Sequence, residues 1–111
     1  MDYIYKICDQ ALWDAACRDG RFTGAEIDVE DGFIHFSTGA QLAETLALHF
    51  VGRENLLVLQ TDPSGLDITW EPARSGDLFP HLYGDLPITA VVSVFPIDLG
   101  PDGRHRLPTQ L

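Results

Sequence analysis

The first third of the chain alternates apolar and polar residues in short stretches that predict one strand and one helix. Tyr3–Cys8 is rich in β-branched and aromatic residues and predicts an opening strand. Asp9 follows as a candidate N-cap, and Gln10–Asp19 carries an apolar stripe that predicts a helix ending at Gly20. Residues 21–32 are polar, include four acidic side chains and predict a loop.

The next stretch predicts a strand that runs directly into a second helix. Gly32–Ser37 is the strand, and Thr38–Gln41 fits a capping box, in which the Thr hydroxyl and the Gln amide each satisfy a free backbone donor. The helix that follows ends at Gly52. It places five residues on one face at helical spacing, namely Leu42, Thr45, Leu46, His49 and Phe50.

The second half of the chain is dominated by strand patterns. Asn55–Thr61 is almost continuously apolar, as expected of a strand buried on both faces, and Leu66–Glu71 alternates. Residues 72–87 hold three prolines and predict no long element. Ile88–Phe95 predicts a further strand, and residues 101–103 a hairpin turn before a short edge strand at 104–106.

This order of elements predicts a single α+β domain over residues 1–111. Two main helices near the N-terminus precede most of the strands, without strict β-α alternation, which favours a mixed, mainly antiparallel, split sheet. No glycine-rich phosphate loop occurs, which argues against a doubly wound nucleotide-binding fold.

Composition and charge limit the kinds of binding partner that we expect for this protein. The 111 residues contain seven Lys and Arg against seventeen Asp and Glu, a formal net charge of −10. A negative field repels phosphate backbones and anionic membranes, so we expect neither generic nucleic-acid binding nor membrane adhesion. The sequence has no signal-peptide pattern and only Cys8 and Cys17, so we expect a cytoplasmic protein with free thiols and leave its oligomeric state open.

His35 is a polar residue within an apolar strand, just before a strand-to-helix turn. Alternation places Phe33, His35 and Ser37 on one face, and the helix start beside the Ser37 and Thr38 hydroxyls predicts a site for an anion or a hydroxyl group. The alternative is structural: His35 is a core histidine bonded to a backbone carbonyl, and the two hydroxyls only cap the helix.

Phe79, His81 and Tyr83 form the second dense stretch of chemistry-bearing residues. In an extended segment all three side chains point the same way, which is typical of a pocket wall where rings stack on a planar ligand. The alternative is a loop fastened to the core by Phe79 and Tyr83.

Glu71 ends a strand and is a candidate to bind a ribose hydroxyl or to act as a general base, with a solvated strand-end acid as the alternative. Its neighbour Trp70 is interpreted as a core residue. The spacing of the histidines and Glu71 matches no common metal motif, and neither cysteine has the surroundings of a catalytic thiol, so no metal site is expected.

Three motifs together resemble the bacterial domain-of-unknown-function family 952. They are Gly32–Thr38 with Gln41, then Trp70-Glu71, then Phe79–Gly84 with the following Ala90-Val91-Val92. The family is distantly similar in fold to the ADP-ribosyltransferases and the RNA 2′-phosphotransferases, which hold NAD or an ADP-ribose-like species between two small sheets.

The resemblance implies a cleft for NAD or ADP-ribose as substrate or ligand. It implies that His35, Ser37 and Thr38 line one wall and that a covering loop contributes His81 and Tyr83. Glu71 would orient a ribose and, with His35, carry the catalysis. Many relatives have a histidine in the opening strand where this chain has Lys6, which could pair with a phosphate but, while charged, accepts no hydrogen bond.

Three hypotheses follow from these residues. The first is an ADP-ribosyltransferase-like enzyme, in which Lys6 and His35 hold the dinucleotide and His81 and Tyr83 close over its nicotinamide end. The second is a binding module that senses a nucleotide or another small polar metabolite without turnover, which Lys6 favours. The third is an acidic protein-interaction domain with structural histidines.

Overall fold

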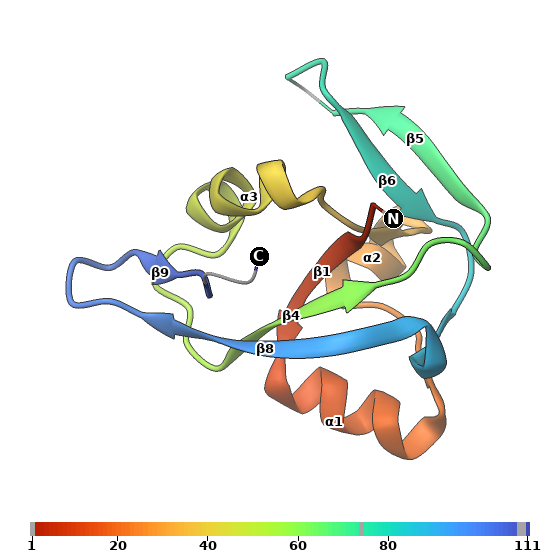
Figure 1. Cartoon of the computed structure of the whole chain (residues 1–111), viewed down its shortest axis with the longest axis horizontal. Coiled ribbons are helices and arrows are strands. Elements are labelled where there is room, and N and C mark those ends of the chain that lie inside the picture. Colours follow the sequence, from red (N-terminus) through yellow and green to blue (C-terminus); the bar gives the residue numbers. More distant parts are fainter. Residues whose placement is uncertain (1, 74, 109–110) are drawn as a thin grey trace.

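Two antiparallel sheets make up most of the computed structural model, which describes residues 2–73, 75–108 and 111 (Figure 1). The larger sheet has the strand order β1-β4-β8-β9, formed by Ile4–Asp9, Leu56–Thr61, Val91–Leu99 and His105–Arg106. The smaller sheet has the order β3-β6-β5, formed by Ile34–His35, Leu78–Leu82 and Ile68–Pro72. A two-stranded ribbon joins β2 (Arg21–Phe22) to β7 (Leu86–Pro87).

Every ladder between the described strands is antiparallel. The predicted α+β class is therefore confirmed, whereas the described part of the chain contains no parallel pair that would make the sheet mixed. The two sheets meet at one isolated bridge, in which the backbones of Tyr5 and Ser37 exchange two hydrogen bonds of 2.8 Å. The β5–β6 hairpin extends away from the larger sheet beyond this bridge (Figure 1).

Two helices cover opposite faces of the larger sheet. Because side chains alternate along β1 and β4, each strand supplies both cores. Helix α1 (Gln10–Asp19) packs Ala16 against the first core, which includes Ile4, Cys8, Leu57 and Leu59. Helix α3 (Leu42–His49) packs Leu42 and Leu46 against the second, which includes Ile7, Leu56, Val58 and Ile97.

Helix α1 begins and ends where the sequence predicts, but the predicted capping bond from the Asp9 side chain does not form. Gly20 adopts the left-handed conformation (φ 88°) and its N–H bonds to the Ala16 carbonyl, which ends the helix. The Asp9 side chain makes no capping bond to the helix. Arg53 Nη2 lies 2.6 Å from Asp9 Oδ1 instead, so the carboxylate is used in an ion pair.

The capping box before α3 is confirmed. Thr38 Oγ1 accepts from Gln41 N, and Gln41 Oε1 accepts from Thr38 N, at the start of the 3₁₀ turn η1 (Gly39–Gln41). The apolar face that the sequence predicts for this helix is correct except at its end, because His49 is exposed to solvent.

Two segments predicted to be irregular contain regular structure. Residues 21–32 hold β2 and a short helix, α2 (Glu26–Asp31), and residues 72–87 hold β6. Pro80 lies within β6 where β3 ends, and its carbonyl accepts from Phe36 N, so its missing N–H interrupts no long ladder.

Some predicted strands also have different boundaries in the structure. The strand expected at Gly32–Ser37 shrinks to β3 and the Ser37 bridge. The strand expected at Ile88–Phe95 begins later and ends later, as the 3₁₀ turn η2 (Ile88–Ala90) followed by β8. The short edge strand after the turn at 101–103 is present as β9.

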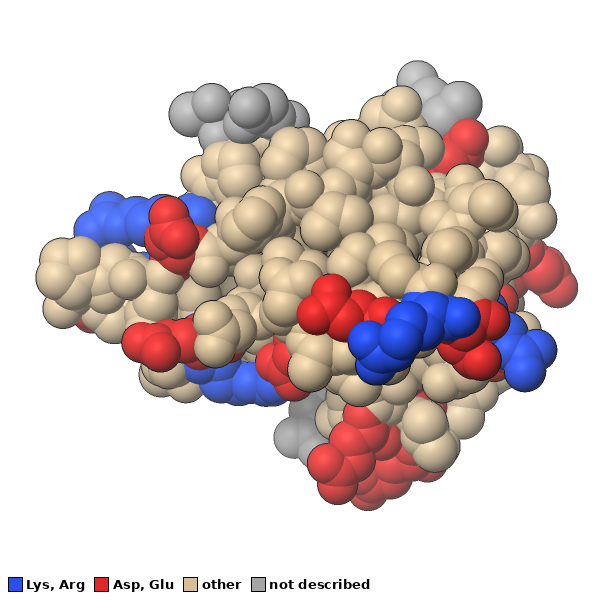
Figure 2. Space-filling view, turned by 90° about the horizontal axis from the view of Figure 1, so that it is seen from below, with Lys and Arg blue, Asp and Glu red and all other residues tan. Residues whose placement is uncertain are grey.

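The surface mixes charges of both signs. Figure 2 shows one face on which Lys and Arg lie as separate small groups beside Asp or Glu, with no continuous basic patch. Three of the arginines pair with carboxylates: Arg21 with Asp19 and Asp85, Arg53 with Asp9, and Arg106 with Asp102. In the described ranges no helix has the length and apolarity that crossing a bilayer requires.

Candidate functional site

One face of the smaller sheet gathers the histidines. The register places His35 of β3 opposite His81 of β6, and Glu71 of β5 opposite Phe79, so these side chains share one side of the sheet. Phe33 and Tyr83 extend the same side beyond the strand ends. We call Phe33, His35, Glu71, His81 and Tyr83 together the histidine face.

Phe33 lies at the centre of this face. Its ring centroid is 4.1 Å from that of His81 in a stacked arrangement, 4.5 Å from His35 and 5.2 Å from Tyr83. The two imidazoles meet edge to face at 5.4 Å. Such distances are those of packed aromatic pairs, so the rings hold one another in place.

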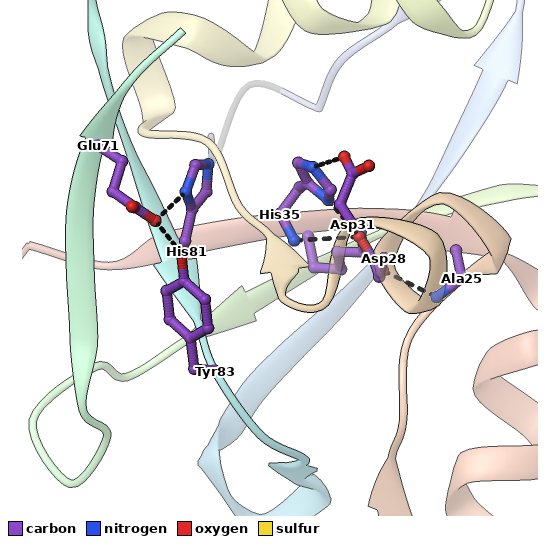
Figure 3. A network of polar contacts seen from close by, with 8 residues as sticks. Ala25, Asp28, Asp31, His35, Glu71, His81 and Tyr83 are labelled. Atoms are coloured by element: carbon purple, nitrogen blue, oxygen red, sulfur yellow. Dashed lines mark hydrogen bonds and ion pairs between the residues drawn. The ribbon is translucent and has the colours of Figure 1, made fainter.

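Glu71 is fixed by two donors (Figure 3). His81 Nδ1 lies 2.8 Å from Glu71 Oε1 and the Tyr83 hydroxyl donates to the same oxygen over 2.7 Å. These two hydrogen bonds, from Tyr83 and then His81, lower the pKa of Glu71, and the bond to Glu71 raises the pKa of Tyr83. The Glu71 side chain is 36% exposed, so an oriented, ionised carboxylate is open to solvent.

His35 lies between two carboxylates. Its Nδ1 is 2.6 Å from Asp28 Oδ1 and its Nε2 is 3.0 Å from Asp31 Oδ2. A neutral imidazole has one N–H donor, whereas the imidazolium has two. The protonated ring is therefore the form that satisfies both contacts.

Asp28 is the buried residue at the centre of a network of hydrogen bonds and ion pairs that includes His35. It accepts from Lys6 Nζ at 2.8 and 3.0 Å, from Ala25 N at 2.8 Å and from His35 N at 3.1 Å, and its side chain is 1% exposed. Burial alone would raise the pKa of Asp28, but the bond to His35 and the charge of Lys6 lower it to about 2. Burial lowers the pKa of Lys6, and Asp28 opposes that shift.

The local sequence explains how these residues come together. Asp28 is the third residue of α2, where a carboxylate reaches back to the N–H of the preceding cap residue, here Ala25. Gly32 ends α2 in the left-handed conformation (φ 86°), which turns the chain so that β3 carries His35 back past Asp28 and Asp31.

Four of the predicted site residues lie together, namely His35, Glu71, His81 and Tyr83. His81 belongs to β6 and not to a covering loop, which corrects the expectation for that segment. Phe79 lies half-buried opposite Glu71 on the same side of the sheet. The other three are placed differently. Lys6 is buried against Asp28, Ser37 Oγ bonds to Thr45 Oγ1, and Thr38 caps η1.

Phe33, Asp28 and Asp31 are the members of the site that sequence reasoning did not select. The alternation that places Phe33 beside His35 is visible in the sequence, and so is the four-residue spacing of Asp31 and His35. Asp28 has no comparable signal, because its main cationic partner, Lys6, is 22 residues away. Among the described residues, no three His, Cys, Asp or Glu side chains are grouped to hold a metal ion.

Comparison with known proteins identifies relatives but no activity. Residues 7–94 match the family described as "Protein of unknown function (DUF952)". The crystal structure of protein CC0527 from Caulobacter crescentus is 45% identical, with a TM-score of 0.90 over 95% of this chain and 94% of that one. The solution structure of CC0527 gives a TM-score of 0.86 over 100% and 97%. No curated protein matches the chain.

Proposed function

The chain belongs to the DUF952 family, and we propose that its histidine face binds the ribose and base end of NAD or of an ADP-ribose-type ligand. The observation that carries this proposal is the geometry of Glu71. Both hydrogen bonds to its carboxylate end on Oε1, so within the described residues Oε2 is free to accept from a ligand. A held, ionised carboxylate is the group that vicinal ribose hydroxyls bind best.

The charges around the histidine face favour binding of the base end of the ligand over binding of its phosphates. Two partly exposed carboxylates, Asp31 and Glu71, lie beside the two histidines. Negative groups attract the positively charged nicotinamide ring and repel a diphosphate. The diphosphate of a bound dinucleotide would therefore extend away from the face.

The same arrangement suits chemistry at the glycosidic bond. When the bond between ribose C1′ and nicotinamide breaks, its electron pair leaves with the base and positive charge develops on the ribose. Glu71 would stabilise that charge while Oε2 holds a ribose hydroxyl, and His81 and Tyr83 would keep the carboxylate in position. An incoming hydroxyl would then bond to C1′ and release its proton to solvent water. The distant similarity in fold to the ADP-ribosyltransferases is itself part of this proposal.

A binding module without turnover is the second candidate, and the position of Lys6 favours it. ADP-ribosyltransferases use a first-strand residue to contact the nucleotide, but Lys6 is held by Asp28 and is 5% exposed at its side chain. A protein that lacks this contact binds the ligand less firmly in the orientation that transfer needs. This candidate predicts the same binding face and no release of nicotinamide.

One titration tests both candidates. The protein is titrated with NAD and with ADP-ribose, amide NMR shifts are followed, and nicotinamide release is assayed in the same samples. Shifts centred on Phe33, Glu71 and His81 would support the site, and release would separate the enzyme from the binding module. Glu71→Gln should weaken binding about tenfold or more, whereas Glu44→Gln, an exposed acid on α3, should not. No shifts at millimolar ligand would rule out the dinucleotide.

A further inference from the structure

The histidine face holds four side chains that could exchange a proton with a ligand, namely His35, Glu71, His81 and Tyr83. The proposed function needs such a group, because a hydroxyl that attacks ribose C1′ has to lose its proton. A base placed beside the hydroxyl speeds this loss. The contacts of each side chain separate the four.

Three of them are poorly suited to accept a proton. Both ring nitrogens of His35 already contact carboxylates, at 2.6 Å and 3.0 Å. The bond to Glu71 raises the pKa of the Tyr83 hydroxyl, so Tyr83 keeps its proton. The bonds from Tyr83 and His81 lower the pKa of Glu71, so its carboxylate is a weaker base than that of an ordinary glutamate.

His81 has one ring nitrogen in use and one without a partner. Its Nδ1 lies 2.8 Å from Glu71 Oε1. An ionised carboxylate can only accept, so the proton between these two atoms belongs to Nδ1, and in the neutral ring Nε2 carries the lone pair. An imidazole is ordinarily a stronger base than a carboxylate by about two pKa units, which favours Nε2 over Glu71.

The Nε2 atom of His81 is also accessible to solvent. It has no hydrogen-bond partner among the described residues, and within those residues no buried side-chain nitrogen or oxygen is left without one. Nε2 therefore reaches the surface, although the His81 side chain as a whole is 10% exposed. Figure 3 shows this nitrogen on the side of the ring that is turned away from Glu71. A water molecule or a ligand hydroxyl can approach it there.

The His81 ring is held in one orientation before any ligand binds. Glu71 fixes Nδ1, and Phe33 stacks on the ring with centroids 4.1 Å apart and planes at 26°. Strand β6, which carries His81, is the central strand of its sheet. A reacting group that is already oriented loses little freedom during the reaction. Nε2 and Glu71 are separated by the width of one imidazole ring and one hydrogen bond, so one ligand can contact both.

We propose that His81 is the general base of the histidine face, with Nε2 taking the proton of the O–H group that attacks ribose C1′. This role rests on the proposed function, in which Glu71 Oε2 holds a ribose hydroxyl. The new O–C1′ bond forms, the bond from C1′ to nicotinamide breaks, and its electron pair leaves with nicotinamide. The O–H proton moves to Nε2, and His81 then passes it to solvent water. Glu71 Oε1 orients His81 throughout.

The tautomer of His81 can be measured without a ligand. Long-range ¹H–¹⁵N NMR spectra of the full chain, recorded at about pH 8.5 where imidazoles are ordinarily neutral, distinguish protonated from unprotonated ring nitrogens. His81 should carry its proton on Nδ1. His105 is an internal control with the opposite tautomer, because its Nε2 lies 2.7 Å from the Arg53 carbonyl oxygen, which can only accept. A proton on Nε2 of His81 would overturn the proposal.

His81→Asn separates a base from a residue that only positions Glu71. The Asn amide can still donate to Glu71, but it offers no basic nitrogen. With NAD as substrate and water as the attacking O–H group, kcat for nicotinamide release should fall about a hundredfold, with KM little changed. His49→Asn, which changes an exposed histidine on α3, should release nicotinamide at the wild-type rate.

The outcomes distinguish the general base from the proposed function as a whole. No nicotinamide release from the wild-type protein would overturn the proposed enzyme and this step with it. Release that His81→Asn leaves unchanged would overturn the general base alone. If circular dichroism shows that His81→Asn does not fold, the tautomer spectrum of the wild-type chain still tests the assignment.

Discussion

Trp70 and Glu71 are neighbours in one strand, yet the two sides of the sheet to which they point are built differently. On the side of Glu71, Phe33 contacts three other rings and the carboxylate has two donors. On the side of Trp70, the indole is half exposed. Strand alternation decides which side a residue faces, and the neighbouring elements decide whether it is packed.

The difference comes from α2 and β3. These elements bring Asp28, Asp31, Phe33 and His35 to the histidine face. The histidine face should therefore contribute to the stability of the fold, whereas the half-exposed side chain of Trp70 should contribute little. Four changes test this contrast.

Asp28→Ala should have the largest effect. It leaves Lys6 buried without its carboxylate and removes the acceptor of His35 and Ala25, which costs about 3–5 kcal/mol for a broken buried ion pair. Urea denaturation measures the loss. Asp31→Ala, which removes an exposed acid from the same helix, should cost less than about 1 kcal/mol. Similar losses of stability in both variants would show that Asp28 is not the centre of the polar network.

Acid should act through the same residue. The folded-state pKa of Asp28 is about 2, below its ordinary value of 3.8, so its ionised form stabilises the fold. That contribution, on the order of 2 kcal/mol, is present above about pH 4 and lost as the pH falls toward 2. The urea midpoint measured from pH 6 to pH 2 should fall less steeply in Asp28→Asn. Trp70→Leu should keep the wild-type pH dependence.

Phe33→Leu compared with Trp70→Leu tests packing alone. Phe33 is half-buried among three rings, so shortening it should cost about 1–2 kcal/mol in the free energy of unfolding. Trp70→Leu should stay within about 0.5 kcal/mol of wild type, as exposed substitutions usually do. Thermal unfolding followed by circular dichroism gives both values. A larger loss at Trp70 would reverse the contrast between the two sides.

The substitutions with the smallest effects on stability should give the clearest results for ligand binding. Glu71→Gln should weaken NAD or ADP-ribose binding, whereas Trp70→Leu, on the other side of β5, should leave it unchanged. Calorimetric titration of each ligand into both variants measures the affinities. Loss of binding in Trp70→Leu would show that the two sides of β5 act as one site.

Local signals account for the parts of the fold that the sequence predicts correctly. Helix α1 begins and ends as expected because its apolar stripe and Gly20 determine its length within one segment. The Thr38–Gln41 box forms because both bonding partners lie three residues apart. In such cases the interactions that stabilise the element are all visible in one short window of sequence.

Helix α2 could not be predicted because its apolar residues face solvent and its buried residue is acidic. Its apolar residues Ile27 and Val29 are 58% and 69% exposed, while Asp28 is buried. Only the partners Lys6 and His35, from other elements, make that burial favourable. The same long-range ion pair removes Lys6 from the ligand-binding position that the first strand suggests.

The candidate site was predictable where strand alternation determines it and not where packing does. His81 and Tyr83 share a side because residues two apart in an extended segment do, and the sequence shows that spacing. His35 and Glu71 join them through the pairing of β3 and β5 with β6, which the sequence does not show. Trp70 looks like a core residue by its type, but the edge position of β5 leaves it without a covering element.

The single bridge between the two sheets has a consequence for hydrogen exchange. Strand β4 lies between β1 and β8 and is buried along most of its length, so its amides should exchange only when the whole chain unfolds. The β5–β6 hairpin is joined to the larger sheet through β3 and the Tyr5–Ser37 bridge, so it can open as a separate unit at lower cost in free energy. A ligand on the histidine face would then slow exchange in this hairpin.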